Sequence, residues 1–163
     1  MYLTKRIENN LTHIKGTLFP YVSLKSSPLR YKVIIGIGGN MGDTKRVFDK
    51  LFYFFQREKL VSTQRTSSIL KNPPFGYLNQ PFFFNSVMIL ETNLRPHQLL
   101  RYLLHVEKRF RRKRSFSDAP RTLDLDILFY ENKKINKKDL TIPHPHWFKR
   151  TSVVIPLMEV IDK

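Results

Sequence analysis

The chain contains no cysteine among its 163 residues. Disulfide bonds, thiolate catalysis and cysteine-bound zinc are therefore excluded. It also lacks any hydrophobic run near the roughly 18 residues that suggest a membrane-spanning helix. Lys5, Arg6 and Glu8 occur early with no apolar stretch behind them, so we expect no secretory signal. These absences favour a cytoplasmic protein.

Acidic residues are scarce, with 13 Asp and Glu against 29 Lys and Arg, which gives a formal charge of +16. A charge of this size favours a polyanionic partner, either a nucleic acid or a nucleotide polyphosphate. A basic surface that only contacts solvent explains the excess equally well. Because acidic side chains are rare, a place where two of them stand close together is informative.

The segment 121–130 contains such a pair, Asp124 and Asp126, within an otherwise apolar run. If the run is a strand, side chains alternate between its faces, and the two aspartates share one face. The other face then holds four apolar side chains: Leu123, Leu125, Ile127 and Phe129. Two neighbouring carboxylates repel each other unless a positive group lies between them, and a hard divalent cation fits well. The pattern therefore predicts a metal site.

The rest of the chain is predicted to be one α+β domain. Apolar and turn patterns indicate, in order, a strand over 32–38, a helix over 44–58, strands over 61–70 and 82–92, a helix over 96–110 and the strand over 121–130. This order predicts a ferredoxin-like α/β sandwich with an antiparallel central sheet and helices on its faces.

The two ends of the chain are predicted to be appendages to this core. Residues 1–30 lack sustained periodicity and read as an N-terminal extension, partly ordered or peripheral to the domain over 31–163. Residues 131–134 should form a hairpin turn into Ile135, and a short helical segment should finish the chain.

A glycine-rich turn over 36–42 follows the first core strand and precedes a helix. A dinucleotide fingerprint would need a third glycine at position 41, which is Met41, and the Gly-Lys of a P-loop is missing. The turn is therefore either a tight strand-to-helix connection or a backbone contact with a ligand.

Basic residues crowd the segment just before the aspartates: Arg109, Arg111, Arg112, Lys113, Arg114 and Arg121. A charge run is usually a solvated loop. Here it leads directly to the carboxylates, and metal ions beside arginines are the recurring arrangement for phosphoryl transfer. Further along, His144 lies between two prolines, where it either supports a turn or lines a nucleotide site together with Thr141 and Arg150.

The segment 72–85 combines prolines, asparagines and aromatic residues. Aromatic faces can sandwich a flat heterocycle, and an amide can read paired donors and acceptors on its edge. Phe82 and Phe84 are expected in the core. Phe83 and Asn85 are two apart and should share the opposite face.

Five ordered groups of residues together resemble one known family. They are Gly-Gly-Asn-Met-Gly at 38–42; Asn-Pro-Pro-Phe-Gly at 72–76 with Gln80, Pro81 and Asn85; Glu107 with Arg112 and Arg114; Pro-Arg-Thr-Leu-Asp-Leu-Asp at 120–126; and Ile-Pro-His-Pro at 142–145 with Arg150. Over about residues 32–160 the chain resembles the 6-hydroxymethyl-7,8-dihydropterin pyrophosphokinase family of folate biosynthesis.

The resemblance implies transfer of pyrophosphate from ATP to the hydroxymethyl group of the pterin, with release of AMP, and it implies ATP and two Mg²⁺ as cofactors. It assigns the metal to Asp124 and Asp126, and catalysis to Arg112, Arg121 and Asp126. It assigns the nucleotide to Arg114, Thr141, His144, Arg150 and Glu107, and the pterin to Asn85, Phe83, Pro74 and Phe75. The partners are then the pterin and ATP, without nucleic acid or membrane, and we expect a monomer.

Ser152 stands where this family has a ring that stacks on the pterin, and Phe75 or Trp147 could replace that ring. Two other interpretations remain at this stage. One is a basic ferredoxin-like RNA-binding module, although the sequence lacks the aromatic signature typical of that class. The other is a homologue that has lost its activity.

Overall fold

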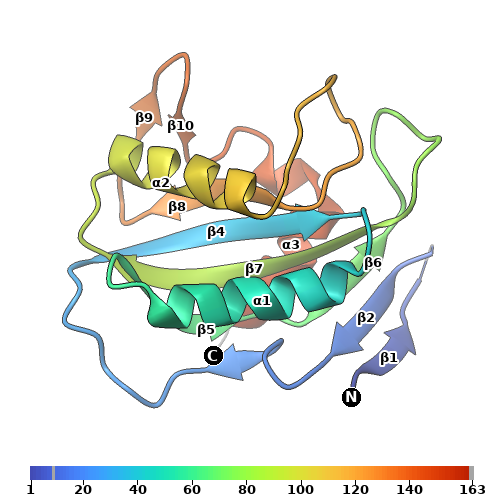
Figure 1. The fold of residues 1–163 in the computed structure, drawn as a ribbon, viewed down its shortest axis with the longest axis horizontal. Helices are drawn as coiled ribbons and strands as arrows, with labels where there is room; N and C mark the ends of the chain where they lie inside the picture. The colour runs from blue at the N-terminus through green and yellow to red at the C-terminus, as the bar shows by residue number, and fades with distance from the viewer. Residues whose placement is uncertain (9, 162–163) are drawn as a thin grey trace.

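The structure is a computed structural model, and it describes residues 1–8 and 10–161. Its core contains the elements in the predicted order (Figure 1). They are strand β4 (Tyr31–Gly39), helix α1 (Thr44–Arg57), strands β5 (Val61–Thr66), β6 (Ile69–Asn72) and β7 (Phe83–Thr92), helix α2 (Pro96–Arg109) and strand β8 (Asp124–Tyr130). Positions 162 and 163, the end of the predicted domain, lie outside the described residues.

The sheet is antiparallel, with β4 between β7 and β8, while both β5 and β6 pair with β7. Helices α1 and α2 cover one face, and α3 (Thr151–Ile161) lies behind the sheet (Figure 1). The predicted α+β sandwich of ferredoxin-like type is therefore confirmed. No helix among the described residues is long and apolar enough to cross a membrane.

Strand alternation gives the sheet two different faces. Odd-numbered apolar residues of β4 pack with α1 and α2 in the larger core, together with Leu125 and Ile127 of β8. Val87 and Leu128 belong to a smaller cluster beneath α3. Asp124 and Asp126 face this second side, as predicted, and the smaller cluster leaves part of it open as a cavity.

Two local irregularities depart from the predicted pattern. The strand expected over 61–70 is divided into β5 and β6, because the Ser67 hydroxyl accepts the Val87 N–H (2.9 Å) in place of a ladder carbonyl. In β8 the register against β4 shifts so that Leu128 is an extra residue. Regular alternation predicted Phe129 beside Leu125 and Ile127. Because of the shift, Phe129 packs in the smaller cluster instead.

The helix boundaries follow from simple local signals. Asp43 caps α1 by accepting the Arg46 N–H (3.2 Å), and Pro96 occupies the first turn of α2. Phe84 packs against the larger core as expected, whereas Phe82 precedes the start of β7 and is only half-buried, outside both core clusters.

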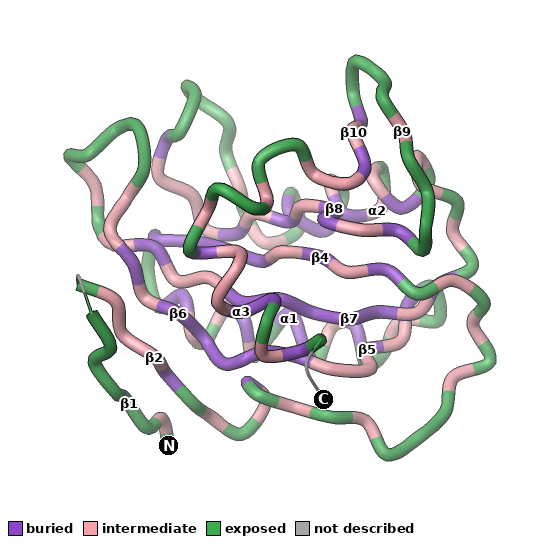
Figure 2. Tube along the Cα trace, turned by 180° about the vertical axis from the view of Figure 1, so that it is seen from behind, coloured by how far each residue is buried: buried purple, intermediate pink, exposed green. Residues whose placement is uncertain are grey.

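The N-terminal segment contributes strands β1 (Leu3–Arg6), β2 (Thr12–Lys15) and β3 (Tyr21–Val22). Strand β2 pairs with β6 and β3 pairs with β5, so this segment extends the same sheet. Phe19 is fully buried against Phe48 and Phe52 of α1. Figure 2 shows β1 exposed throughout at the edge, while buried residues gather along β6 and β7. The domain boundary near residue 30 stays a prediction.

The C-terminal third adds small elements around the site. After the turn at 131–134, β9 (Ile135–Asn136) pairs with β10 (Thr141–Ile142) and not back onto β8. A short 3₁₀ helix, η1 (Trp147–Lys149), then leads into α3. This path brings the segment 142–153 alongside β8.

Candidate active site

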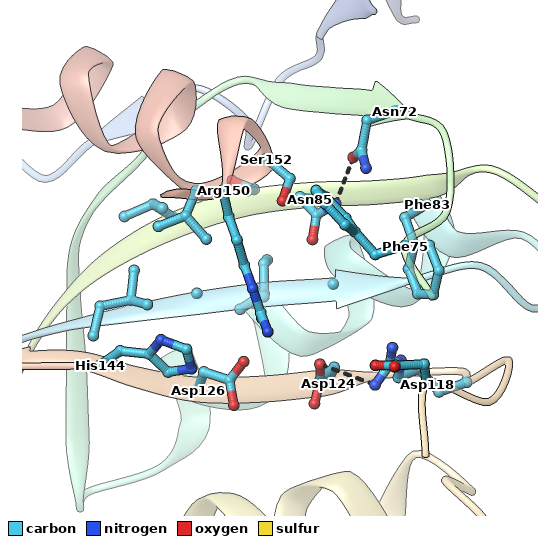
Figure 3. Close-up of a pocket in the computed structure, with 18 of the residues that line it drawn as sticks. Asn72, Phe75, Phe83, Asn85, Asp118, Asp124, Asp126, His144, Arg150 and Ser152 are labelled. Atoms are coloured by element: carbon cyan, nitrogen blue, oxygen red, sulfur yellow. Dashed lines mark hydrogen bonds and ion pairs between the residues drawn. The ribbon is translucent and has the colours of Figure 1, made fainter. Parts of the chain in front are cut away.

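A cavity of about 320 Å³ opens on the α3 side of the sheet (Figure 3). Most of the predicted site residues line it: Phe75, Phe83, Asn85, Arg112, Arg114, Arg121, Asp124, Asp126, His144 and Arg150. The other three predicted residues, Pro74, Thr141 and Glu107, are not among the described residues that line the cavity. The fold thus brings together in one cavity residues from five separate segments.

The two aspartates differ in their surroundings. Asp124 accepts a hydrogen bond from Arg112 Nη1 and forms an ion pair with Arg121 Nη1 at 3.5 Å. Within the described part of the chain, neither oxygen of Asp126 has a hydrogen-bond donor. Burial and the nearby carboxylates of Asp124 and Glu107 raise the pKa of Asp126 to about 7, against the opposing charges of Arg150 and Arg112. Asp126 is therefore a carboxylate whose charge is poorly compensated by the protein.

This donor set fits Mg²⁺ held jointly with a polyphosphate. No group of three or more His, Cys, Asp or Glu side chains that could hold a metal occurs among the described residues. Mg²⁺ is commonly bound through one or two carboxylates together with substrate phosphates and water, without a complete protein cage. Asp124 and Asp126 supply such a pair.

Glu107 on α2 anchors two of the cavity arginines. It is only 2% exposed. Its Oε1 accepts Arg112 Nη1 (2.8 Å) and the Leu125 N–H (2.8 Å), while Oε2 accepts Arg114 Nη2 (3.0 Å). Burial raises the pKa of Glu107, and the Leu125 N–H and Arg112 partly offset this. Glu107 thus lies behind the arginines and fixes their positions.

The Arg121 side chain packs against an aromatic residue that lines the cavity. Its guanidinium lies over the Phe83 ring, 5.0 Å from the centroid. Its Nε is buried and has no hydrogen-bond partner among the described residues. Arg121 also lines the cavity beside the carboxylate pair, and a guanidinium in this position is suited to an anionic ligand such as a phosphate.

Asn40 supports the site from within the structure, and the sequence did not predict this role. It is buried, and its Oδ1 accepts the Arg121 N–H (2.9 Å). Its Nδ2 donates to Gln80 Oε1 (2.9 Å) and to the Pro81 carbonyl (3.0 Å). A Cβ at Gly39 would lie 2.6 Å from the Thr122 carbonyl oxygen. The glycine-rich turn therefore packs tightly on the segment that carries Arg121 just before β8. The position of Asn40 in this turn was the sequence signal that could have identified it.

Asn85 and Phe83 of β7 line the other end of the cavity, with Phe75 from the loop between β6 and β7. Phe75 is 58% exposed, so its ring is available to a ligand. Trp147 instead packs on Phe129 (5.3 Å between centroids) and lies outside the described lining residues. Ser152 at the start of α3 also lines the cavity and offers no ring.

His144 reaches the cavity beside Asp126 (Figure 3). Its backbone N–H donates to the Leu128 carbonyl at 2.9 Å, which ties the proline-flanked loop to β8. Burial, with Arg150 and His146 nearby, lowers the pKa of His144. The imidazole is therefore neutral near pH 7 and can both donate and accept a hydrogen bond.

An α+β sandwich with a carboxylate pair, convergent arginines and an adjoining aromatic pocket defines a phosphate-transferring enzyme of the nucleotide-dependent class. Residues 34–162 match the 7,8-dihydro-6-hydroxymethylpterin-pyrophosphokinase family, and the chain belongs to that family.

Similar proteins are named for pterin pyrophosphokinase activity or for folate synthesis. The 2-amino-4-hydroxy-6-hydroxymethyldihydropteridine pyrophosphokinase of Helicobacter pylori is 37% identical, over 88% of this chain and 90% of its own length. The Campylobacter jejuni enzyme of that name is 40% identical, over 88% and 91%. A folic acid synthesis protein of Dictyostelium discoideum is 34% identical over 78% of this chain and 19% of its own length.

The chain is thus a diphosphokinase that transfers pyrophosphate from ATP to hydroxymethyldihydropterin in folate biosynthesis. The alternative of an RNA-binding module is not supported.

Proposed function

We propose that Asp124 and Asp126 hold two Mg²⁺ ions together with the triphosphate of ATP, and that Arg112 and Arg121 bind the same phosphates. The observation that carries this proposal is the carboxylate pair on one face of β8, which faces a cavity lined by arginines. When bound, Mg²⁺ would neutralise phosphate charge and make the β-phosphorus more electrophilic.

The reaction itself is a displacement at the β-phosphorus. The hydroxymethyl oxygen of the pterin attacks this phosphorus, the bond from it to the α–β bridging oxygen breaks, and AMP leaves with that oxygen. Asp126 accepts the hydroxyl proton, because its carboxylate faces the cavity and has no hydrogen-bond donor among the described residues. Arg112 and Arg121 stabilise the charge that develops on the transferred group and on AMP.

The remaining polar residues divide between the two substrates. Arg114, His144 and Arg150 contact the nucleotide, with Thr141 beside them, and Glu107 acts behind Arg112 and Arg114. Asn85 reads the pterin edge, while Phe83, Phe75 and the main chain at Pro74 form its walls. Phe75 replaces the ring that Ser152 lacks, because Trp147 is already packed on Phe129.

Calorimetric titration of the pterin in the presence of a non-hydrolysable ATP analogue tests this assignment. The parent chain should bind the pterin. Phe75→Ala should weaken binding about tenfold, since stacking of a flat heterocycle on an aromatic side chain is worth roughly 1–3 kcal/mol. Trp147→Phe is the control and should leave the affinity unchanged. A parent chain that binds the nucleotide analogue but no pterin would indicate an inactive homologue.

We also propose that the enzyme works as a monomer, because one chain supplies every residue assigned to the cavity. Analytical ultracentrifugation should then give the mass of a single chain. Specific activity should not depend on enzyme concentration, whereas loss of activity on dilution would contradict the proposal.

A further inference from the structure

Two asparagine side chains form a hydrogen-bonded pair at the pterin end of the cavity (Figure 3). Asn85 Nδ2 donates to Asn72 Oδ1 at 2.6 Å, and Asn72 Nδ2 donates to the Pro73 carbonyl oxygen at 2.9 Å. Asn72 is 4% exposed. Both polar groups of Asn72 therefore have partners in the protein.

Gly38 of β4 leaves room for the Asn85 amide on its other side. A Cβ at position 38 would lie 2.7 Å from Asn85 Oδ1, which is closer than real Cβ contacts allow. If the Asn85 amide rotated by half a turn, its oxygen would face Asn72 Oδ1 and two acceptors would meet without a proton between them. The hydrogen bond to Asn72, whose own amide is fixed by the Pro73 carbonyl oxygen, therefore favours one orientation of the Asn85 amide.

We infer that Asn72 is a positioning residue that sets the order of acceptor and donor that Asn85 presents to the bound heterocycle. This inference rests on the proposed role of Asn85 as the reader of the pterin edge. A 2-amino-4-oxo ring places an N–H donor at N3 beside a carbonyl acceptor at C4. A 2,4-diamino ring reverses that order, because N3 becomes an acceptor and the substituent at C4 becomes a donor. A fixed amide matches the first pattern and opposes the second, so Asn72 makes the site selective for 2-amino-4-oxopteridines.

The test compares the dissociation constants of 6-hydroxymethylpterin and its 2,4-diamino counterpart, measured with a non-hydrolysable ATP analogue bound. The parent should favour the 2-amino-4-oxo compound. Asn72→Leu removes the acceptor and frees the amide to rotate, so the ratio of the two constants should fall at least about tenfold, the value of roughly one buried hydrogen bond. Affinity for the ATP analogue should stay unchanged. Should the leucine variant fail to fold, Asn72→Ala makes the same test with a smaller side chain.

Asn72→Asp separates the effect of Asn72 on the orientation of the Asn85 amide from the support that Asn72 gives to the loop at Pro73. Aspartate keeps an acceptor for Asn85 Nδ2 but cannot donate to the Pro73 carbonyl, so it should keep the parent ratio. A ratio that is unchanged in Asn72→Leu, or that falls equally in Asn72→Leu and Asn72→Asp, would overturn the inference.

Asn85→Leu distinguishes this inference from the proposed function. If Asn85→Leu leaves pterin affinity intact, the assignment of Asn85 itself fails. If Asn85→Leu weakens binding while the Asn72 variants keep the parent ratio, only the positioning role of Asn72 is wrong.

Discussion

Glu107 shows how much of the site depends on a residue that does not line the cavity. Its carboxylate holds Arg112, Arg114 and the Leu125 N–H from beneath. A buried charge with three donors is stable only while all partners stay in place, because each loss leaves an uncompensated group in a poorly hydrated site.

Glu107→Gln should therefore lower both stability and activity. We expect the free energy of unfolding to fall by about 2 kcal/mol, because the buried arginine loses one of its carboxylate partners. We expect kcat/KM for ATP to fall about tenfold as Arg112 and Arg114 lose their anchor. Urea denaturation and steady-state kinetics measure the two effects. Glu8→Gln, at an exposed site, is the matched control, and a Glu107 variant that behaves like it would refute the anchoring role.

At the same scale, the spacing of residues decided what could be predicted. Asp124 and Asp126 were found from the sequence because their relation is local, two positions apart on one strand. Asn40 was not assigned to the site, because what defines it is a distant partner. The Arg121 N–H that Asn40 accepts is 81 positions away, and no local pattern reports such a contact.

At the scale of elements, helices were easier to predict than strands. The two core helices were placed within one residue of their ends, because their apolar spacing and the signals at Asp43 and Pro96 are local. The division between β5 and β6 and the extra residue Leu128 depend on pairing with a neighbouring strand. The strands within residues 1–30 likewise depend on β5 and β6 as partners.

Phe19 tests whether the N-terminal segment is integral to the fold. Its ring is fully buried against α1, so Phe19→Ala should leave a cavity and lower the free energy of unfolding by about 3–5 kcal/mol. Leu24→Ala, at a 99% exposed position of the same segment, should change it little. Thermal and chemical denaturation of both variants supply the comparison, and equal stabilities would show that the segment packs only loosely.

At the scale of the whole molecule, the position of the cavity relates the charge of +16 to the function of the site. Arginines surround a site whose substrate is strongly anionic, and a positive field of this kind raises the rate of encounter with anions. The excess of basic residues was readable from composition, but only the fold shows that arginines from separate segments converge.

We therefore expect kcat/KM for ATP to fall several-fold when the ionic strength rises from about 0.05 to 0.3 M, as screening shortens the range of the field. The KM for the uncharged pterin should change much less over the same range. Initial rates at varied salt and fixed free Mg²⁺ measure both, and an equal response of the two substrates would argue against electrostatic attraction of ATP.

The central claim is that the carboxylate pair on β8 and the cavity arginines move pyrophosphate, not a single phosphate, from ATP to the pterin. Chromatographic analysis of the nucleotides formed from ATP, Mg²⁺ and hydroxymethyldihydropterin tests it most directly. The parent and Asp139→Asn, whose side chain is 65% exposed, should produce AMP. Asp126→Asn should fold normally yet form AMP at least about a hundredfold more slowly, since a lost metal ligand removes several kcal/mol of charge stabilisation. Formation of ADP, or AMP formation by Asp126→Asn at the parent rate, would contradict the claim.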